Sequence, residues 1–204
     1  MIMEIIYKNV LDESIEKPQA IALGEYKKIF MEGGSIKKVE SYDVSVLEII
    51  SYYIEAGENE TELVDNLSLL VTQFVVIYDP KVPVGSFYTQ SSRQYRNGSL
   101  VLKGNILFDE FNNLICAEKL NLNTNLPIQE DTVKFYYGTA PTPGDDRVFE
   151  ASYNADGSLF RIDMPDPEEP QDSEVYDTST FGELEVRFPG PPDLSYYLTA
   201  TLEP

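Results

Sequence analysis

Runs of β-branched and aromatic residues alternate with turn residues along most of the chain, and this pattern predicts a sheet built from hairpins. Ahead of the clearest runs we expect a short strand within residues 5–10 and an irregular connection ending at residues 18–24. Three antiparallel strands should follow, the first two separated by Gly33-Gly34, which supplies the positive φ angles of a tight turn. These three expected strands are 26–31, 35–42 and 46–55.

The segment from residue 58 to residue 78 combines two patterns. Its first part has apolar residues at helical spacing, preceded by glutamates that suit the partial positive charge of a helix N-terminus. Residues 74–78 instead resemble a buried strand. We therefore expect a short helix followed by a strand. The apolar residues at helical spacing are Leu63, Leu67, Leu70, Val71 and Phe74.

Hairpin signals return in the second half of the chain. Asn97-Gly98 fits a two-residue turn between strands at 87–96 and 99–108. Asp156-Gly157 predicts a second hairpin, and tyrosine and phenylalanine content suggests a last pair of strands at 181–188 and 195–202. The other expected strands are 114–122, 132–138, 148–153 and 158–164. The predicted fold is mainly β, an antiparallel hairpin-rich sheet of meander or sandwich type with one short helix.

A length of 204 residues suits one domain or two closely packed halves. We expect a single β-rich domain over residues 1–204, with 1–135 and 136–204 as the possible halves. Residues 164–180 contain six acids, no base and three prolines, so we expect an acidic, proline-rich loop there.

Charge limits the partners that this chain can bind. It has 35 acidic and 15 basic residues, for a net charge of −20, and residues 136–204 alone hold 15 acids against three arginines, a net of −12. Such a surface repels nucleic acids and anionic membranes and attracts a basic protein or metal cations. A purely solubilising role is the alternative. The residues predicted to bind a basic protein are Asp145, Asp146, Asp166, Glu168, Glu169, Asp172, Glu174 and Asp177.

Missing residue types exclude several chemistries. The chain has no histidine, which removes Ser-His-Asp and Cys-His catalysis, and its single cysteine, Cys116, has no partner for a disulfide or a zinc site. We expect Cys116 to be a buried apolar group in a strand. No catalytic residue, metal site or cofactor is predicted.

Residues 152–157 with Asp163 resemble part of a calcium-binding loop, but a plain hairpin turn explains them better.

Two other groups of charged residues offer candidate sites. Lys27, Lys28, Lys37 and Lys38 form a basic patch, interpreted as a solvated strand face or as a contact for an anion or a partner. Paired carboxylates can hydrolyse glycosides without histidine. Carbohydrate binding or carboxylate-based glycoside processing is therefore the alternative function. The adjacent acidic pairs are Asp109 with Glu110, Glu130 with Asp131, and Asp145 with Asp146.

Residues 149–162 resemble one hairpin of the tyrosine-rich repeats of the Rhs kind and of bacterial antitoxin-like repeat proteins, and we transfer no function from that short likeness. The charge and the missing catalytic residues favour a non-catalytic interaction protein, most specifically an immunity or antitoxin-type inhibitor that covers a basic partner. Neither a signal peptide nor a membrane span is predicted, so we expect a cytoplasmic protein. No oligomeric state is predicted.

Overall fold

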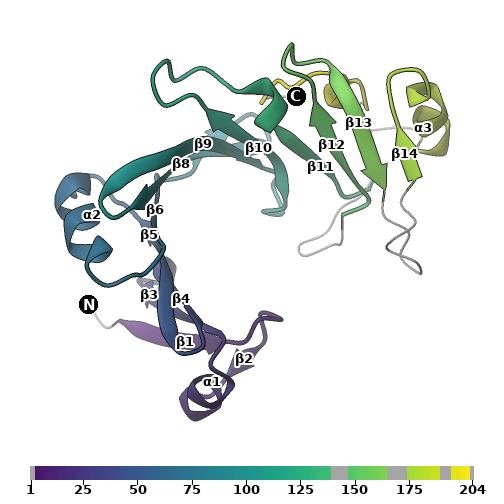
Figure 1. The fold of residues 1–204 in the computed structure, drawn as a ribbon. Coiled ribbons are helices and arrows are strands. Elements are labelled where there is room, and N and C mark those ends of the chain that lie inside the picture. The colour runs from purple at the N-terminus through teal and green to yellow at the C-terminus, as the bar shows by residue number, and fades with distance from the viewer. Residues whose placement is uncertain (1–2, 139–146, 165–173, 189–193, 203–204) are drawn as a thin grey trace. The chain divides into compact units, whose positions relative to one another are not determined.

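The computed structural model describes residues 3–138, 147–164, 174–188 and 194–202 (Figure 1). Within them the chain forms a large, mostly antiparallel sheet and three α-helices, so the predicted mainly β fold is confirmed. The strands are β1 (Glu4–Lys8), β2 (Ser14–Ile15), β3 (Tyr26–Glu32), β4 (Ser35–Asp43), β5 (Val46–Tyr53), β6 (Phe74–Tyr78), β7 (Val82–Val84), β8 (Phe87–Arg96), β9 (Ser99–Phe108), β10 (Leu114–Leu120), β11 (Val133–Tyr136), β12 (Phe149–Tyr153), β13 (Leu159–Met164) and β14 (Glu174–Tyr176). The helices are α1 (Lys17–Leu23), α2 (Glu60–Ser68) and α3 (Phe181–Arg187), with 3₁₀ helices η1 (Gln129–Asp131) and η2 (Leu194–Leu198).

The chain divides into two compact units, each made of two separate segments. Unit 1 comprises Met1–Pro80 and Ser91–Lys103, and unit 2 comprises Lys81–Gln90 and Gly104–Pro204. The β8–β9 hairpin contributes its turn end to unit 1 and its open end to unit 2. The charge step near residue 136 falls inside unit 2, and its use as a functional boundary stays a prediction.

Unit 1 has the strand order β8-β6-β5-β4-β3-β1-β2. The predicted run of three antiparallel strands is confirmed as β3, β4 and β5. Gly33 and Gly34 join the first two with φ angles of 59° and 84°, the left-handed region that this tight turn requires. Asn97 and Gly98 do the same for β8 and β9, with φ angles of 50° and 73°, so that predicted hairpin is also confirmed.

The ambiguous segment after residue 58 is helix α2 followed by strand β6, as predicted. The Asn59 side chain accepts a hydrogen bond from the Glu62 amide and begins the helix. Val64 and Leu67 then pack on buried residues of β5 and β6. Because a helix joins them, β5 and β6 run parallel, a pairing that the hairpin pattern did not predict.

The expectation of an irregular connection at residues 18–24 was wrong, because helix α1 lies there. The backbone N–H of Glu16 donates to the Gln19 side chain at 2.9 Å, which ties down the first turn. Pro18 lies in that first turn, where a missing N–H costs nothing. Gly24 ends the helix at φ 80°, and its N–H donates to the Ala20 carbonyl.

Unit 2 has the strand order β14-β13-β12-β11-β10-β9, with β7 paired to the unit 2 end of β8. The hairpin predicted around Asp156-Gly157 is confirmed as β12 and β13. One edge differs from the prediction: β14 pairs with β13 inside the segment expected to be a loop, with Tyr176 opposite Ile162. Pro165, Pro167 and Pro170 of that expected loop lie outside the described residues.

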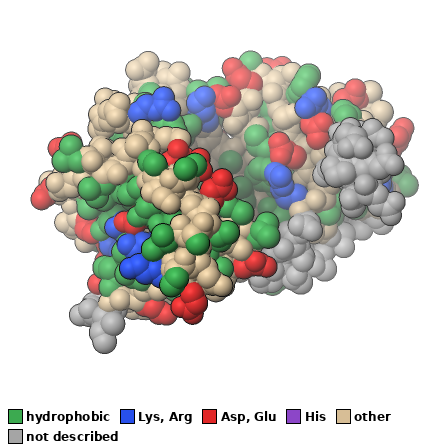
Figure 2. Space-filling model, turned by 60° about the horizontal axis from the view of Figure 1, so that its bottom comes forward, with side chains coloured by type: hydrophobic (Ala, Val, Ile, Leu, Met, Phe, Trp, Pro, Cys, Tyr) green, Lys and Arg blue, Asp and Glu red, His purple; other side chains and the backbone are tan. Residues whose placement is uncertain are grey.

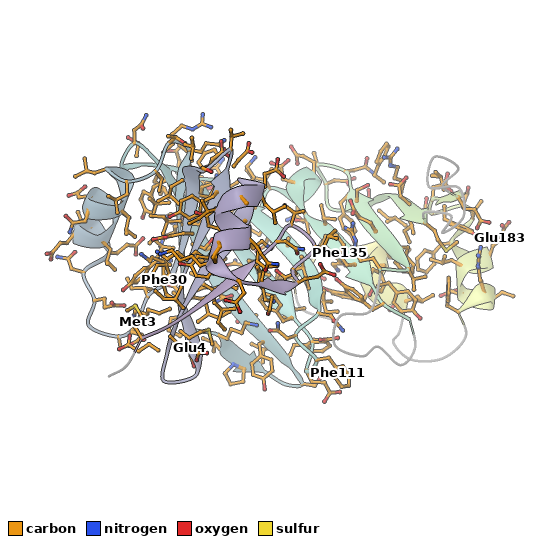
Figure 3. All side chains as sticks on the ribbon, turned by 90° about the horizontal axis from the view of Figure 1, so that it is seen from below. Met3, Glu4, Phe30, Phe111, Phe135 and Glu183 are labelled. Atoms are coloured by element: carbon orange, nitrogen blue, oxygen red, sulfur yellow. The ribbon has the colours of Figure 1, made fainter. Side chains whose placement is uncertain are left out.

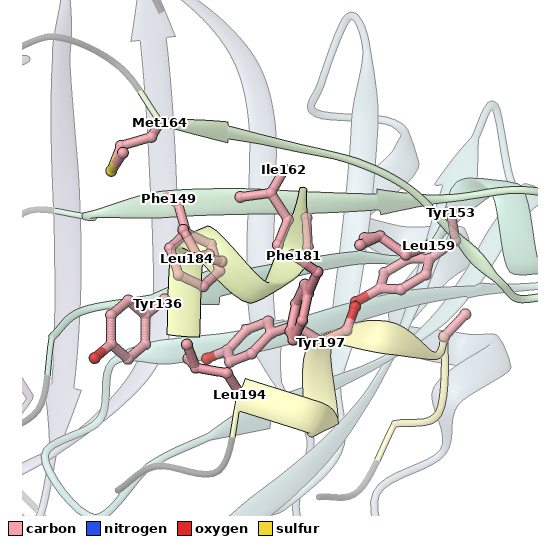
Figure 4. Close-up of a cluster of buried hydrophobic side chains, with 12 residues drawn as sticks. Tyr136, Phe149, Tyr153, Leu159, Ile162, Met164, Phe181, Leu184, Leu194 and Tyr197 are labelled. Carbon is pink, nitrogen blue, oxygen red and sulfur yellow. The ribbon is translucent and has the colours of Figure 1, made fainter. Parts of the chain in front are cut away.

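The last pair of strands was also predicted wrongly, since residues 181–187 form α3 and residues 194–198 form η2. Both helices cover one face of β11, β12 and β13 and complete the core of unit 2 (Figure 4). Rings of Tyr136, Phe149 and Tyr197 meet there, with the Phe149 and Tyr197 centroids 4.9 Å apart at 75°. Helical turns, rather than added strands, thus close this core.

Candidate interaction surface

The structure places only two of the eight predicted partner-binding acids. Glu174 lies on β14, where it accepts hydrogen bonds from Arg187 and from the Tyr176 hydroxyl. Asp177 closes the turn before α3: Ser179 donates to its carboxylate through Oγ at 2.6 Å and N–H at 2.8 Å, and these bonds lower the pKa of Asp177. The other six predicted residues, Asp145, Asp146, Asp166, Glu168, Glu169 and Asp172, lie outside the described residues.

Acidic charge is unequally divided between the two units. Unit 2 has 20 acidic and 6 basic residues, for a net charge of −14, whereas unit 1 has 15 acidic and 9 basic residues, for a net charge of −6. Acidic side chains are scattered over the visible surface instead of forming one patch (Figure 2), and Glu183, for example, lies on α3 (Figure 3). The long-range field of unit 2 is therefore strongly negative.

The basic residues of unit 2 are already engaged within it. Four of them pair with acids of the same unit, and the other two contact aromatic rings: Lys81 Nζ lies 3.7 Å from the Phe108 ring centroid, and Lys134 is buried. Few cations therefore remain to meet an acidic partner. The pairs are Lys119 with Asp131 at 2.7 Å, Arg147 with Glu150 at 2.9 Å, Arg161 with Asp163 at 2.8 Å, and Arg187 with Glu174.

Lys134 is the residue that the sequence patterns missed. It lies on β11 with 0% exposure, opposite Cys116 of β10 and Ala151 of β12. Burial lowers the pKa of the Lys134 amine to about 7. Its position in the sequence could have indicated this burial, because residues two apart in a strand share a face and Tyr136 is a core residue. Cys116 is buried in a strand as predicted, and burial raises the pKa of its thiol to about 12.

The predicted basic patch of unit 1 is internally neutralised. Lys28 and Lys38 converge on the Phe30 ring, with Nζ 4.5 and 4.0 Å from its centroid, and both pair with the buried carboxylate of Glu40 (Phe30 is labelled in Figure 3). The Tyr42 hydroxyl also donates to Glu40. The other two lysines of the patch pair separately, Lys27 with Asp12 and Lys37 with Glu58 and Glu55.

Two cavities of unit 1 have residues of α2 in their lining. One of about 410 Å³ lies beside Phe30, Tyr52 and Leu67, and its polar lining includes the Lys37–Glu58 pair. The other, of about 400 Å³, has Arg93 in its wall. The Arg93 guanidinium forms a bidentate ion pair with the Asp79 carboxylate, through hydrogen bonds of 2.7 and 2.5 Å, and also donates to Glu60 at 2.6 Å. These charges satisfy one another, so neither cavity displays a dominant charge for a ligand.

Other acids that the sequence offered as candidates for catalysis or metal binding form hydrogen bonds or ion pairs with nearby groups. Asp109 is buried and accepts bonds from the Phe111 and Asn113 amides, which makes it a turn former. Asp156 accepts from Ser158 N–H and Oγ, so the hairpin-turn interpretation of residues 152–157 is confirmed. Asp131 of the second carboxylate pair bonds Lys119. Among the described residues, no group of three or more acidic or cysteine side chains is arranged to hold a metal ion.

Comparisons with protein-family models, with curated proteins and with solved structures find no match for this chain. Within the part of the chain that the structure describes, no helix is both long and apolar enough to cross a bilayer.

Proposed function

We propose that this chain is a non-catalytic interaction protein whose unit 2 binds a basic protein, and that its specific role is that of an immunity-type inhibitor covering a basic toxin. The observation that carries the proposal is the net charge of −14 on unit 2, whose basic residues are occupied within the unit. Opposite charge accelerates encounter with a basic partner and disfavours acidic ones. Inhibition by covering a surface requires no catalytic residue.

The first test is capture from the source cell with the full chain as bait, at low and at moderate salt. We expect a basic protein to be retained at low salt and to be lost in part at moderate salt, because salt screens charge attraction beyond about 8 Å at physiological ionic strength. Recovery of neutral proteins alone, or of partners indifferent to salt, would contradict the proposal.

A pair of charge variants then locates the surface. Glu168→Gln with Glu169→Gln removes two charges from the predicted binding residues, and Glu62→Gln with Asp65→Asn removes two exposed charges from α2 of unit 1. Both variants have the same net charge. We expect slower association with the captured partner only for the first. Equal effects of the two variants would show a non-specific response to net charge.

A further inference from the structure

Residues 194–202 lie across one face of β11, β12 and β13 in unit 2, and a small set of hydrogen bonds joins them to it. The Lys134 amine provides two of them, donating to the Tyr196 carbonyl at 2.6 Å and to the Thr199 carbonyl at 2.7 Å. The Ala200 N–H donates to Gly157 at 2.9 Å. Tyr153 and Tyr197 add hydroxyl bonds to backbone carbonyls. We call residues 194–202 the strap.

Lys134 makes these bonds without a counter-ion. It is fully buried, its amine donates to two backbone carbonyls, and no ion pair with a carboxylate is found for it among the described residues. A neutral amine has two N–H groups, which match the two strap carbonyls. An ammonium adds a third N–H and a full charge, which the two carbonyls and the Tyr196 ring, 3.3 Å from Nζ, stabilise without a neutralising carboxylate. A ring offsets only part of the cost of burying an unpaired charge.

The cysteine and tyrosine side chains around the amine stay neutral near pH 7. Cys116 faces it from β10, Tyr153 from β12 and Tyr196 from the strap, and burial raises the pKa of all three. Tyr197 beside them is shifted in the same direction. Glu118 lies two residues from Cys116 and accepts a bond from Asn105. Lys134 is therefore the group whose charge changes in this core near neutral pH.

We propose that the strap is held on unit 2 by the unprotonated amine of Lys134 and is loosened when that amine takes up a proton. In the released state the amine meets water and recovers an ordinary lysine affinity for protons, so proton uptake favours release. The equilibrium constant for release then rises by about tenfold for each pH unit of acidification between about pH 10 and about pH 7, and levels off below.

Hydrogen exchange of the full chain tests this, followed at pH 7 and at pH 9 and corrected for intrinsic exchange rates. We expect the Ala200 amide to open about 50-fold more readily at pH 7 than at pH 9. The amides of β12 and β13 should not follow it. Identical protection of the strap at both pH values, or a parallel change throughout β12 and β13, would overturn the proposal.

Two variants separate the amine from general effects of pH. Lys134→Met cannot take up a proton and should abolish the pH dependence, whereas Lys119→Met, which removes an exposed lysine of the same unit, should keep it. Retention of the dependence in Lys134→Met would refute the role of the amine. Should that variant fail to fold, the ¹³Cε resonance of Lys134 in the unaltered chain decides: a midpoint well below that of the exposed lysines supports the proposal, and an equal one overturns it.

Discussion

Replacing Glu40 by glutamine is expected to destabilise unit 1 out of proportion to the loss of one charge. The Glu40 side chain is 8% exposed and accepts bonds from Lys38 Nζ at 2.7 Å and the Tyr42 hydroxyl at 3.0 Å, with Lys28 Nζ at 3.5 Å. Glutamine keeps the shape but leaves two ammonium groups over the Phe30 ring without a counter-ion. Repulsion between these cations then adds to the lost bonds.

We expect the free energy of unfolding to fall by about 2 kcal/mol, a value typical of losing a hydrogen bond to a charged group whose partners are mostly buried. In urea that cost lowers the midpoint of unfolding by about 1 M for a small unit. Burial alone would raise the pKa of Glu40, but Lys38, Tyr42 and Lys28 outweigh it, so the pKa lies below its usual value. The stabilisation is therefore present at neutral pH and is lost as the pH falls through the lowered pKa.

Equilibrium urea unfolding at pH 7 and at progressively lower pH measures both effects. Glu4→Gln is the matched control, because Glu4 is exposed on β1 and no hydrogen bond or ion pair of its side chain is found among the described residues. We expect the control to stay within about 0.5 kcal/mol of the unaltered chain. The reasoning fails if Glu40→Gln unfolds at the same urea concentration as the control, or if the gap between them does not narrow in acid.

Three further predictions concern turns and the thiol. Asp109→Ala removes the acceptor of the Phe111 and Asn113 amides and should lower the free energy of unfolding in urea by about 2 kcal/mol. Asp109→Asn keeps a side-chain oxygen and should lower it by less. Gly98→Ala should cost about 1–2 kcal/mol because φ is 73° there, and a variant as stable as the parent would contradict the left-handed turn. Cys116 should resist alkylation at pH 8 until urea unfolds the chain, and rapid labelling of the folded protein would disprove its burial.

Local turn and cap chemistry accounts for the parts of the fold that the sequence predicts well. Asn97-Gly98 fixes a hairpin within four residues, and Asn59 with the acids after it marks the start of α2. The pairing of β5 with β6 depends on a helix between them, and no local pattern encodes it. Sequence reasoning therefore finds the elements more readily than it finds their neighbours.

Helix α3 shows why short segments mislead. Over seven residues, the apolar positions Leu184 and Val186 fit a strand with one buried face equally well. The helix instead buries Phe181 and Leu184, and it leaves Val186 80% exposed. Prediction of the candidate interaction surface was limited in a related way. Counting charges gave the sign of its net charge, but the ion-pair partners of the unit 2 bases depend on which residues the fold brings together.

The interleaving of the two units has a consequence for synthesis on the ribosome. Strand β6 ends at Tyr78, but its partner on one side, β8, is complete only after the chain has passed through residues 81–90 of unit 2. Until then Val75 to Tyr78 present an unpaired apolar edge, the kind of edge that recruits other strands. A fragment ending at residue 80 should aggregate for this reason, so the first half of the nascent chain depends on rapid arrival of the next twenty or so residues.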